Sequence, residues 1–267
     1  QEGLTDVFDF FIRYHETRPT VDLFVAQDRA ETLFQLQSEG QYVLATQAKS
    51  FAEADSATNK FAGSTVLDVA NRMASEYNAF ALPELTLIDE HVQLGRTVYF
   101  QDNQLIGYFN REQSRGYLAA VYTIRNGVMV LDIPDIGTIS LKLENTSSKI
   151  TADIVDDVPH FQIEVSCKAY ISEINQDLRK KLSLDVYEKF ETALNEKLKL
   201  QIESAVEQAV IRDSTDIFNF DVALPQQQTE YWKVHRDSWA QELAKIKYTV
   251  NVTSSVDRVQ QEASPAF

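Results

Sequence analysis

Three aspartates in one short stretch are the first side chains of this sequence that could do chemistry. Asp153, Asp156 and Asp157 lie in DIVDD, two residues before Pro159. Clustered carboxylates can bind calcium, which prefers oxygen ligands, or can act as the acid and base of a hydrolase. Carboxylates also gather in solvated turns of acidic proteins. We expect a solvated turn here, with weak calcium binding and hydrolysis as the alternatives.

Histidine and cysteine form no recognisable catalytic pattern. The four histidines lie far apart in the sequence, and none has a second ligand at metal-binding spacing: His15, His91, His160 and His235. The sequence contains no GxSxG, phosphate-loop or GxGxxG motif. Cys167, the single cysteine, lies in the alternating stretch FQIEVSCKAYI and is expected to be a buried, inert strand residue. A reactive or metal-binding thiol is the alternative. We expect no catalytic residue, no metal and no cofactor.

Two charged stretches could bind a partner or serve the structure. RYHETRP (13–19) contains Arg13 and Arg18, which could hold an anion or could place favourable cations at a helix C-terminus. NREQSRG (110–116) contains Glu112, Arg115 and Gly116, next to a predicted strand. Its charged side chains could form surface ion pairs or be buried and structural, and the spacing does not decide between these alternatives.

Both tryptophans lie near the C-terminus, in the stretch DIFNFDVALPQQQTEYWKVHRDSW (216–239). Trp232 and Trp239 are seven residues apart, which places them on one face of a helix. Thr229 is the expected N-cap of that helix. The aromatic face could pack against the next sheet or could form a surface for a partner.

The elements that must position these residues follow from the apolar periodicity. Helices are predicted over 5–15, 28–37, 64–77 with a Ser64 cap, and 181–213, the last one long and amphipathic. Strands are predicted over 21–26, 82–88, 92–100, 105–109, 116–124 and 246–256, and as a meander over 127–133, 136–145, 149–157 and 160–171. The residues QDNQ (101–104) are predicted to form a hairpin turn. The fold class is therefore α+β, with several mixed, mostly antiparallel sheets that each pack against helices.

The charge of the chain excludes whole classes of partner. The 267 residues carry a formal net charge of −15, with 44% hydrophobic and 24% charged residues. Such a surface repels phosphate backbones and anionic lipid head groups, so we expect no nucleic-acid partner and no purely electrostatic hold on a membrane. No run of 18 apolar residues is present that could span a bilayer.

Three stretches, in order and at suitable separations, resemble the Ger(x)C family, the C subunits of spore nutrient germinant receptors. Residues 3–34 resemble the family's helix, R-P pair, buried strand and second helix. Residues 94–118 resemble its G-t-a-v-F, K-L-v-G-x-L and E-T-R-G-x-L sequence, with EQSRG in place of E-T-R-G. Residues 216–252 resemble its D-I-F-G-F-G element, two tryptophans and closing strand. Asn219 and Asp221 replace the two glycines, and such residues tolerate a positive φ better than most.

The resemblance implies a non-enzymatic lipoprotein subunit that supports nutrient-triggered germination. It implies contacts with a multi-spanning A subunit and a transporter-like B subunit at the outer face of the inner spore membrane. The membrane anchor would be a lipid on a cysteine upstream of this chain, and the chain itself would be a soluble fragment. A stand-alone extracytoplasmic module that binds a small ligand is the alternative.

The resemblance also implies three mixed α/β domains. We expect residues 1–45 to be the remnant of the first domain, 60–125 to form a small middle domain, and 126–260 to form a C-terminal domain with the long helix. The residues that we expect to contact a partner or to serve the structure are Arg13, Arg18, Glu112, Arg115, Gly116, Trp232 and Trp239.

Overall fold

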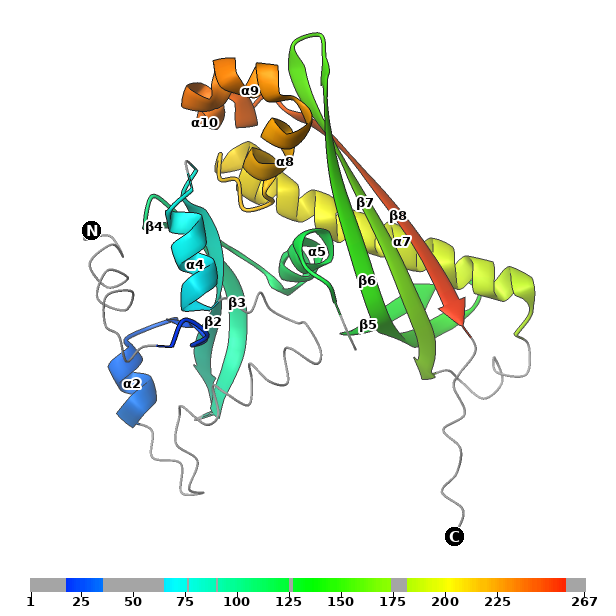
Figure 1. Cartoon of the computed structure of the whole chain (residues 1–267). Helices are drawn as coiled ribbons and strands as arrows, with labels where there is room; N and C mark the ends of the chain where they lie inside the picture. Colours follow the sequence, from blue (N-terminus) through cyan, green and yellow to red (C-terminus); the bar gives the residue numbers. More distant parts are fainter. Residues whose placement is uncertain are drawn as a thin grey trace.

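The computed structural model describes residues 18–35, 65–75, 77–89, 91–124, 127–173 and 182–257. They form two four-stranded sheets, each packed with helices, which confirms the predicted α+β class (Figure 1). The helix predicted over 5–15 lies outside the described residues. The division into segments 1–45, 60–125 and 126–260 stays a prediction.

The first sheet has the strand order β1 (Val25–Ala26), β2 (Ala79–Ile88), β3 (His91–Gln101) and β4 (Gln104–Phe109). Strand β1 is parallel to β2, whereas the β2–β3 and β3–β4 pairs are antiparallel. The predicted β3–β4 hairpin is confirmed. Its two turn residues, Asp102 and Asn103, both have positive φ, as a tight two-residue turn requires.

Two short helices accompany this sheet, α2 (Ala30–Gln35) and α4 (Val66–Met73). Val69 of α4 packs on Phe80 and Phe100, whose rings stack with their centroids 5.1 Å apart. The N-cap of α4 is Thr65 instead of the predicted Ser64. Thr65 forms a capping box with Asp68, which satisfies backbone donors at the start of the helix.

The second sheet has the strand order β5 (Gly127–Ile133), β6 (Gly137–Val155), β7 (Val158–Glu173) and β8 (Lys247–Asp257). Strand β8 is parallel to β7, and the other pairs are antiparallel. The prediction of two separate strands over 136–145 and 149–157 is wrong. Strand β6 runs through both without a turn, because NTSSK between them contains no glycine or proline and pairs with β7 across a bulge.

Helix α7 (Leu184–Val206) crosses one face of the second sheet and continues as a π-helical turn over 207–212 (Figure 1). This confirms the predicted long helix. The stretch around the tryptophans is not one helix but α8 (Phe220–Gln227), α9 (Thr229–His235), a 3-10 turn over 236–238 and α10 (Trp239–Leu243). Thr229 does not cap α9, because its hydroxyl donates to the carbonyl of Pro225. Nowhere in the described ranges does a helix combine the length and the apolar character needed to cross a membrane.

The strand predicted over 116–124 is wrong, because these residues belong largely to helix α5 (Arg111–Val121). Asn110 starts the helix: its side chain accepts hydrogen bonds from the N–H groups of Glu112 and Gln113, at 2.9 Å each. The side chain of Gln113 accepts the N–H of Asn110 in return, at 3.1 Å. This capping box outweighs the β-propensity of the tyrosine and valine that follow.

Gly116 allows α5 to lie directly against α7. A Cβ atom added there would stand 2.2 Å from the carbonyl oxygen of Gln201 and 2.6 Å from the backbone nitrogen of Ile202. Any side chain at position 116 would therefore push the two helices apart. The residues of α5 on both sides of this contact are buried: Ser114, Tyr117, Leu118, Ala119 and Ala120.

Replacing Gly116 with alanine is expected to lower the free energy of unfolding by about 2 kcal/mol or more, because the α7 backbone must move. In an exposed helix the same change raises stability by about 1 kcal/mol, because alanine has the higher helix propensity. The sign of the stability change therefore distinguishes close helix packing from helix propensity. Urea unfolding followed by circular dichroism measures the difference. Arg111→Ala, in the exposed first turn of α5, is the control and should change stability by less than about 0.5 kcal/mol. Equal stabilities of the two variants would contradict the close contact.

Candidate functional site

The two sheets meet at residues 213–221, which connect the π-helical turn to α8. One hydrophobic cluster contains residues of both sheets, including Tyr99 and Phe109 of the first and Phe161 of the second. A continuous run of aromatic rings crosses the junction, with neighbouring centroids 4.1 to 6.3 Å apart. In order, the rings are Tyr99, Phe109, Tyr117, Phe218, Phe220, Phe161, Trp239 and Trp232.

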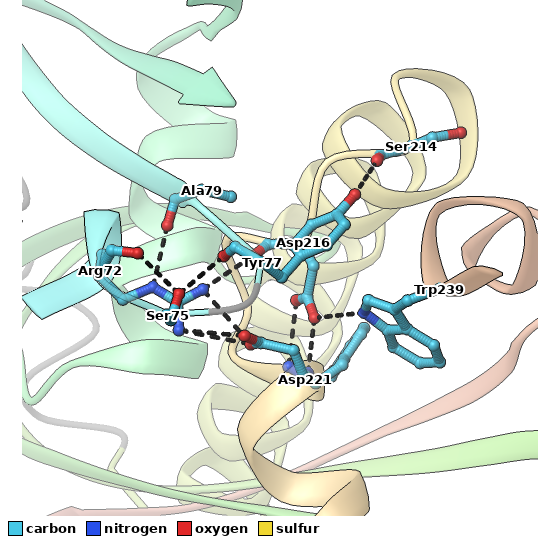
Figure 2. Close-up of polar contacts among 9 residues, drawn as sticks. Arg72, Ser75, Tyr77, Ala79, Ser214, Asp216, Asp221 and Trp239 are labelled. Atoms are coloured by element: carbon cyan, nitrogen blue, oxygen red, sulfur yellow. Dashed lines mark hydrogen bonds and ion pairs between the residues drawn. The ribbon is translucent and has the colours of Figure 1, made fainter. Parts of the chain in front are cut away.

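Arg72 in the last turn of α4 bonds the first sheet's side of the molecule to the second (Figure 2). Its Nε donates to the carbonyl of Ala79 at 2.9 Å, and its Nη2 donates to the carbonyl of Asp216 at 3.3 Å. The guanidinium also pairs with the carboxylate of Asp221 at 3.3 Å. A single side chain thus holds the start of β2, the junction segment and α8 together.

Asp216 is fully buried, and its carboxylate organises the start of α8 (Figure 2). It accepts the backbone N–H groups of Phe220 at 3.0 Å and Asp221 at 2.6 Å. It also accepts the indole N–H of Trp239 at 3.2 Å. Asn219 enters the helix in the left-handed conformation with φ 63°, as its place in the family's glycine pattern predicted.

Two tyrosines of the first sheet's side add further bonds to the same segment. The hydroxyl of Tyr77 donates to the carbonyl of Ser214, and that of Tyr99 donates to the carboxylate of Asp213. The ring of Tyr99 also fills the space over Gly107 of β4, where a Cβ atom would collide with its hydroxyl. The junction therefore combines buried polar groups with buried aromatic rings.

The junction contains more buried acids than cations, because Asp216 and Asp221 share the single guanidinium of Arg72. Burial and the nearby charge of Asp216 raise the pKa of Asp221 to about 7, although Arg72 acts in the opposite direction. Burial also raises the pKa of Asp216, although the two backbone N–H groups that it accepts act in the opposite direction. With both acids ionised, the cluster carries one excess negative charge in a medium of low polarity, and a single proton removes it.

The arrangement suits a mechanical connection better than a ligand pocket. The cavity beside Arg72 has a volume of about 40 Å³, far below the several hundred Å³ of ordinary ligand sites. The polar groups face one another instead of a common empty point. The junction can therefore hold two parts of the chain in one relative position.

The two tryptophans differ in burial but pack against each other. Trp239 is buried, bonded to Asp216 and packed edge-on against Phe161. Trp232 is half-buried and packs edge-on against Trp239, with the centroids 5.3 Å apart. The seven-residue spacing brings the rings together even though a 3-10 turn interrupts the helix.

The other predicted residues do not converge on one place. Arg13 lies outside the described residues, and Arg18 is exposed near the start of the described chain. Glu112 is exposed in the first turn of α5, Arg115 is half-buried in its middle, and Gly116 contacts α7. Burial, with a contribution from Arg111, lowers the pKa of Arg115. Of the acids of DIVDD, Asp156 and Asp157 form the turn between β6 and β7 and have the positive φ of turn residues, whereas Asp153 lies in β6.

The remaining candidates for chemistry lie in ordinary structural positions. Cys167 is buried in β7, and burial raises the pKa of its thiol to about 12, so it is protonated. His160 pairs across the sheet with Asp153, and His235 stacks on Tyr231 of the same helix. Within the described ranges, no group of three histidine, cysteine or acidic side chains is placed to hold a metal ion.

Sequence reasoning missed most of the junction. Asp216 and Asp221 lie between aromatic residues in DIFNFD, and an acid flanked by apolar neighbours is a signal of a buried, bonded carboxylate. Arg72, Tyr77 and Tyr99 carry no comparable signal, because their partners lie more than a hundred residues away in the chain.

Arg72→Ala is expected to lower the free energy of unfolding by roughly 3 kcal/mol, because it leaves the carboxylate of Asp221 buried without its cation. Arg72→Lys should be more stable than Arg72→Ala but less stable than the wild type, since an ammonium keeps the charge but cannot bond Ala79, Asp216 and Asp221 together. Chemical denaturation measures both. Arg212→Ala removes an exposed arginine paired with Glu207 and should change stability by less than about 1 kcal/mol. A loss no larger for Arg72→Ala than for Arg212→Ala would contradict the clamp.

The shared proton predicts a specific pH dependence. Because the pKa of Asp221 is raised in the folded protein, the folded state retains a proton that the unfolded chain releases above about pH 4. The stabilisation relative to Asp221→Asn is therefore present at low pH and is lost as the pH rises through about 7. Unfolding curves of both proteins between about pH 4 and pH 7 measure the difference in their free energies of unfolding. A difference that grows in favour of the wild type as the pH rises would contradict the prediction.

Two family models and one solved structure match most of the chain. Residues 95–260 match the family model described as spore germination B3/GerAC like, C-terminal, and residues 1–87 match the spore germination protein N-terminal domain. The fold is similar to the crystal structure of the GerBC protein, with a TM-score of 0.72 and 15% identity, covering 96% of this chain and 75% of that one. A search of curated proteins finds no match. The order of the two domain models and the shared α+β fold lead to one conclusion: the chain belongs to the Ger(x)C family of spore germination proteins, the C subunits of germinant receptors.

Proposed function

We propose that the chain is the folded part of a receptor C subunit that contacts the A and B subunits at the outer face of the inner spore membrane. A lipid carried upstream of this chain would hold it there. Family membership supports the receptor role, and the net charge of −15 supports a lipid anchor over electrostatic attachment to anionic head groups. The role is contact and transmission of a conformational state, without bond chemistry.

The junction between the sheets is the observation that carries this proposal. Arg72 on one side bonds Asp216 and Asp221 on the other, and the aromatic rings form one packed run between them. Packed interfaces of this kind move between discrete arrangements instead of deforming gradually. A subunit that contacts the first sheet can therefore change the position of the second sheet through this junction.

Spores that carry the full-length protein provide the test. Arg72→Ala should slow the optical-density fall after addition of nutrient, because the two parts no longer move together. The amount of protein in the membrane fraction and its co-purification with the A and B subunits should persist. Germination by a stimulus that bypasses nutrient receptors should be unchanged, and Arg212→Ala should behave as wild type.

Two results would contradict different parts of the proposal. If purified Arg72→Ala protein shows the expected loss of stability, but spores that carry this variant germinate normally with nutrient, transmission through the junction is contradicted. Wild-type protein that fails to co-purify with the A and B subunits would contradict the receptor assembly itself. Replacement of the upstream cysteine should release the protein from the membrane fraction, which tests the lipid anchor separately.

A further inference from the structure

Strand β8 forms one edge of the second sheet, with β7 on its other side (Figure 1). The N–H of Val256 donates to the side chain of Glu191 on α7 at 2.9 Å, so it points away from β7. Backbone groups alternate in direction along a strand. The same outer edge therefore presents the backbone groups of the other even-numbered residues, Tyr248, Val250, Val252 and Ser254. No described residue forms a hydrogen bond with these backbone groups on the outer edge.

The other edges of the two sheets carry the protections that are usual for edge strands. Strand β1 has only two residues, and β4 pairs with β3 across a bulge. On β5, the Nζ of Lys197 donates to the carbonyl of Val130 at 3.0 Å and covers the edge there. Strand β8 pairs in continuous register with β7 and has no glycine, proline or charged residue between Lys247 and Asp257. Among the described strands, β8 is therefore the one whose edge is open to a further strand.

The sequence of β8 is complementary to itself in one antiparallel register. Val252 is the middle residue of the strand, so a two-fold axis at Val252 pairs the whole strand with that of a second copy. Lys247 then lies opposite Asp257 of the second copy, and Tyr248 lies opposite Val256. The remaining pairs are Thr249 with Ser255, Val250 with Ser254, Asn251 with Thr253, and Val252 with itself. Opposite charges, an aromatic ring against a β-branched residue, and hydroxyl pairs are favourable cross-strand neighbours.

The two faces of the strand also match in this register. The odd-numbered side chains of β8 are exposed, whereas the even-numbered ones lie on the face that α7 covers, where the hydroxyl of Ser254 donates to the carbonyl of Glu191. Pairing about an axis perpendicular to the sheet places exposed face beside exposed face and covered face beside covered face. Tyr248 and Val252 are only half-buried on the covered face. A second strand beside β8 would cover the open sides of these two side chains.

We propose that two copies of the chain associate through antiparallel pairing of β8, which joins their second sheets into one continuous sheet. The contact uses the same surface on both copies, so it closes after two copies and produces a dimer. Backbone hydrogen bonds form between the even-numbered residues, and the pairs of Lys247 with Asp257 at both ends fix the register. The net charge of −15 on each copy opposes association at low salt, and physiological salt screens much of this repulsion. This inference does not depend on the receptor role.

Sedimentation equilibrium of the purified chain tests the association directly. In about 150 mM salt the average mass should rise from that of a monomer towards twice that value between about 1 and 100 µM protein, as expected for a micromolar dissociation constant. At low salt the same rise should require more protein, because the like charges are less screened. A mass of 30.4 kDa at every concentration in physiological salt would overturn the proposal.

A matched pair of proline variants locates the contact. Val252→Pro removes a donor from the outer edge without removing a hydrogen bond to β7, so the variant should remain a monomer at every concentration. Val128→Pro is the control, because the carbonyl of Val130 points to the outer edge of β5 and the N–H of Val128 therefore does as well. This control should dimerise like the wild type. Equal dimerisation of the two proline variants would overturn the assignment to β8.

Charge variants test the register without changing the backbone. Lys247→Glu and Asp257→Lys should each weaken the dimer about fivefold, because each places like charges opposite one another. The double variant should recover most of the affinity, because it restores opposite charges at both ends of the paired strands. A double variant no tighter than the single ones would overturn the register centred on Val252.

Cross-linking provides a second test of the register. Val252→Cys should form an intermolecular disulfide on mild oxidation, because opposed Cα atoms of paired strands lie about 5.5 Å apart. Val130→Cys is the control, at a position of β5 that is 48% exposed, and it should cross-link far more slowly. Cross-linking of the two variants at the same rate would indicate random collision and would overturn the proposed pairing.

Discussion

The bond between Arg72 and the two buried acids is the constraint on which the arrangement of the molecule depends. A guanidinium has five donors in a fixed plane, so it can bond two carbonyl groups and a carboxylate without moving. Arg72 uses this geometry to join α4 and β2 to the segment that starts α8. Both carboxylate side chains are buried and the arginine is largely so, which strengthens each of these bonds and makes each partner costly to lose.

The need to join the two sheets at this point explains why the stretch DIFNFD combines aromatic and acidic residues. Its phenylalanines fill the space between the sheets, and Asp216 bonds the N–H groups of the helix that must begin there. The indole of Trp239 completes this set from the far side. The carboxylate of Asp216 is held in place by these donors, whereas that of Asp221 depends on Arg72.

Helix α5 provides the second connection, and its helical state was not predicted. Residues 116–124 contain tyrosine, valine and isoleucine, which favour strands. The capping box of Asn110 and the close contact of Gly116 with α7 outweigh that preference, and the contact forms only once α7 is in place. Strand β6 shows the converse: a polar stretch without glycine or proline stays extended because β7 pairs with it on one side.

By itself, the sequence determined the local features of this protein. Alternation, helical periodicity and turn chemistry predicted the α+β class, the β3–β4 hairpin, α7 and β8, because each depends on neighbours in the chain. It also provided the resemblance to the Ger(x)C family. Only the tertiary structure decided that Arg72 meets Asp221, that Trp232 packs on Trp239 across a broken helix, and that Gly116 contacts α7. These contacts join residues that are distant in the chain or separated by a change of helix direction, and no local preference encodes their meeting.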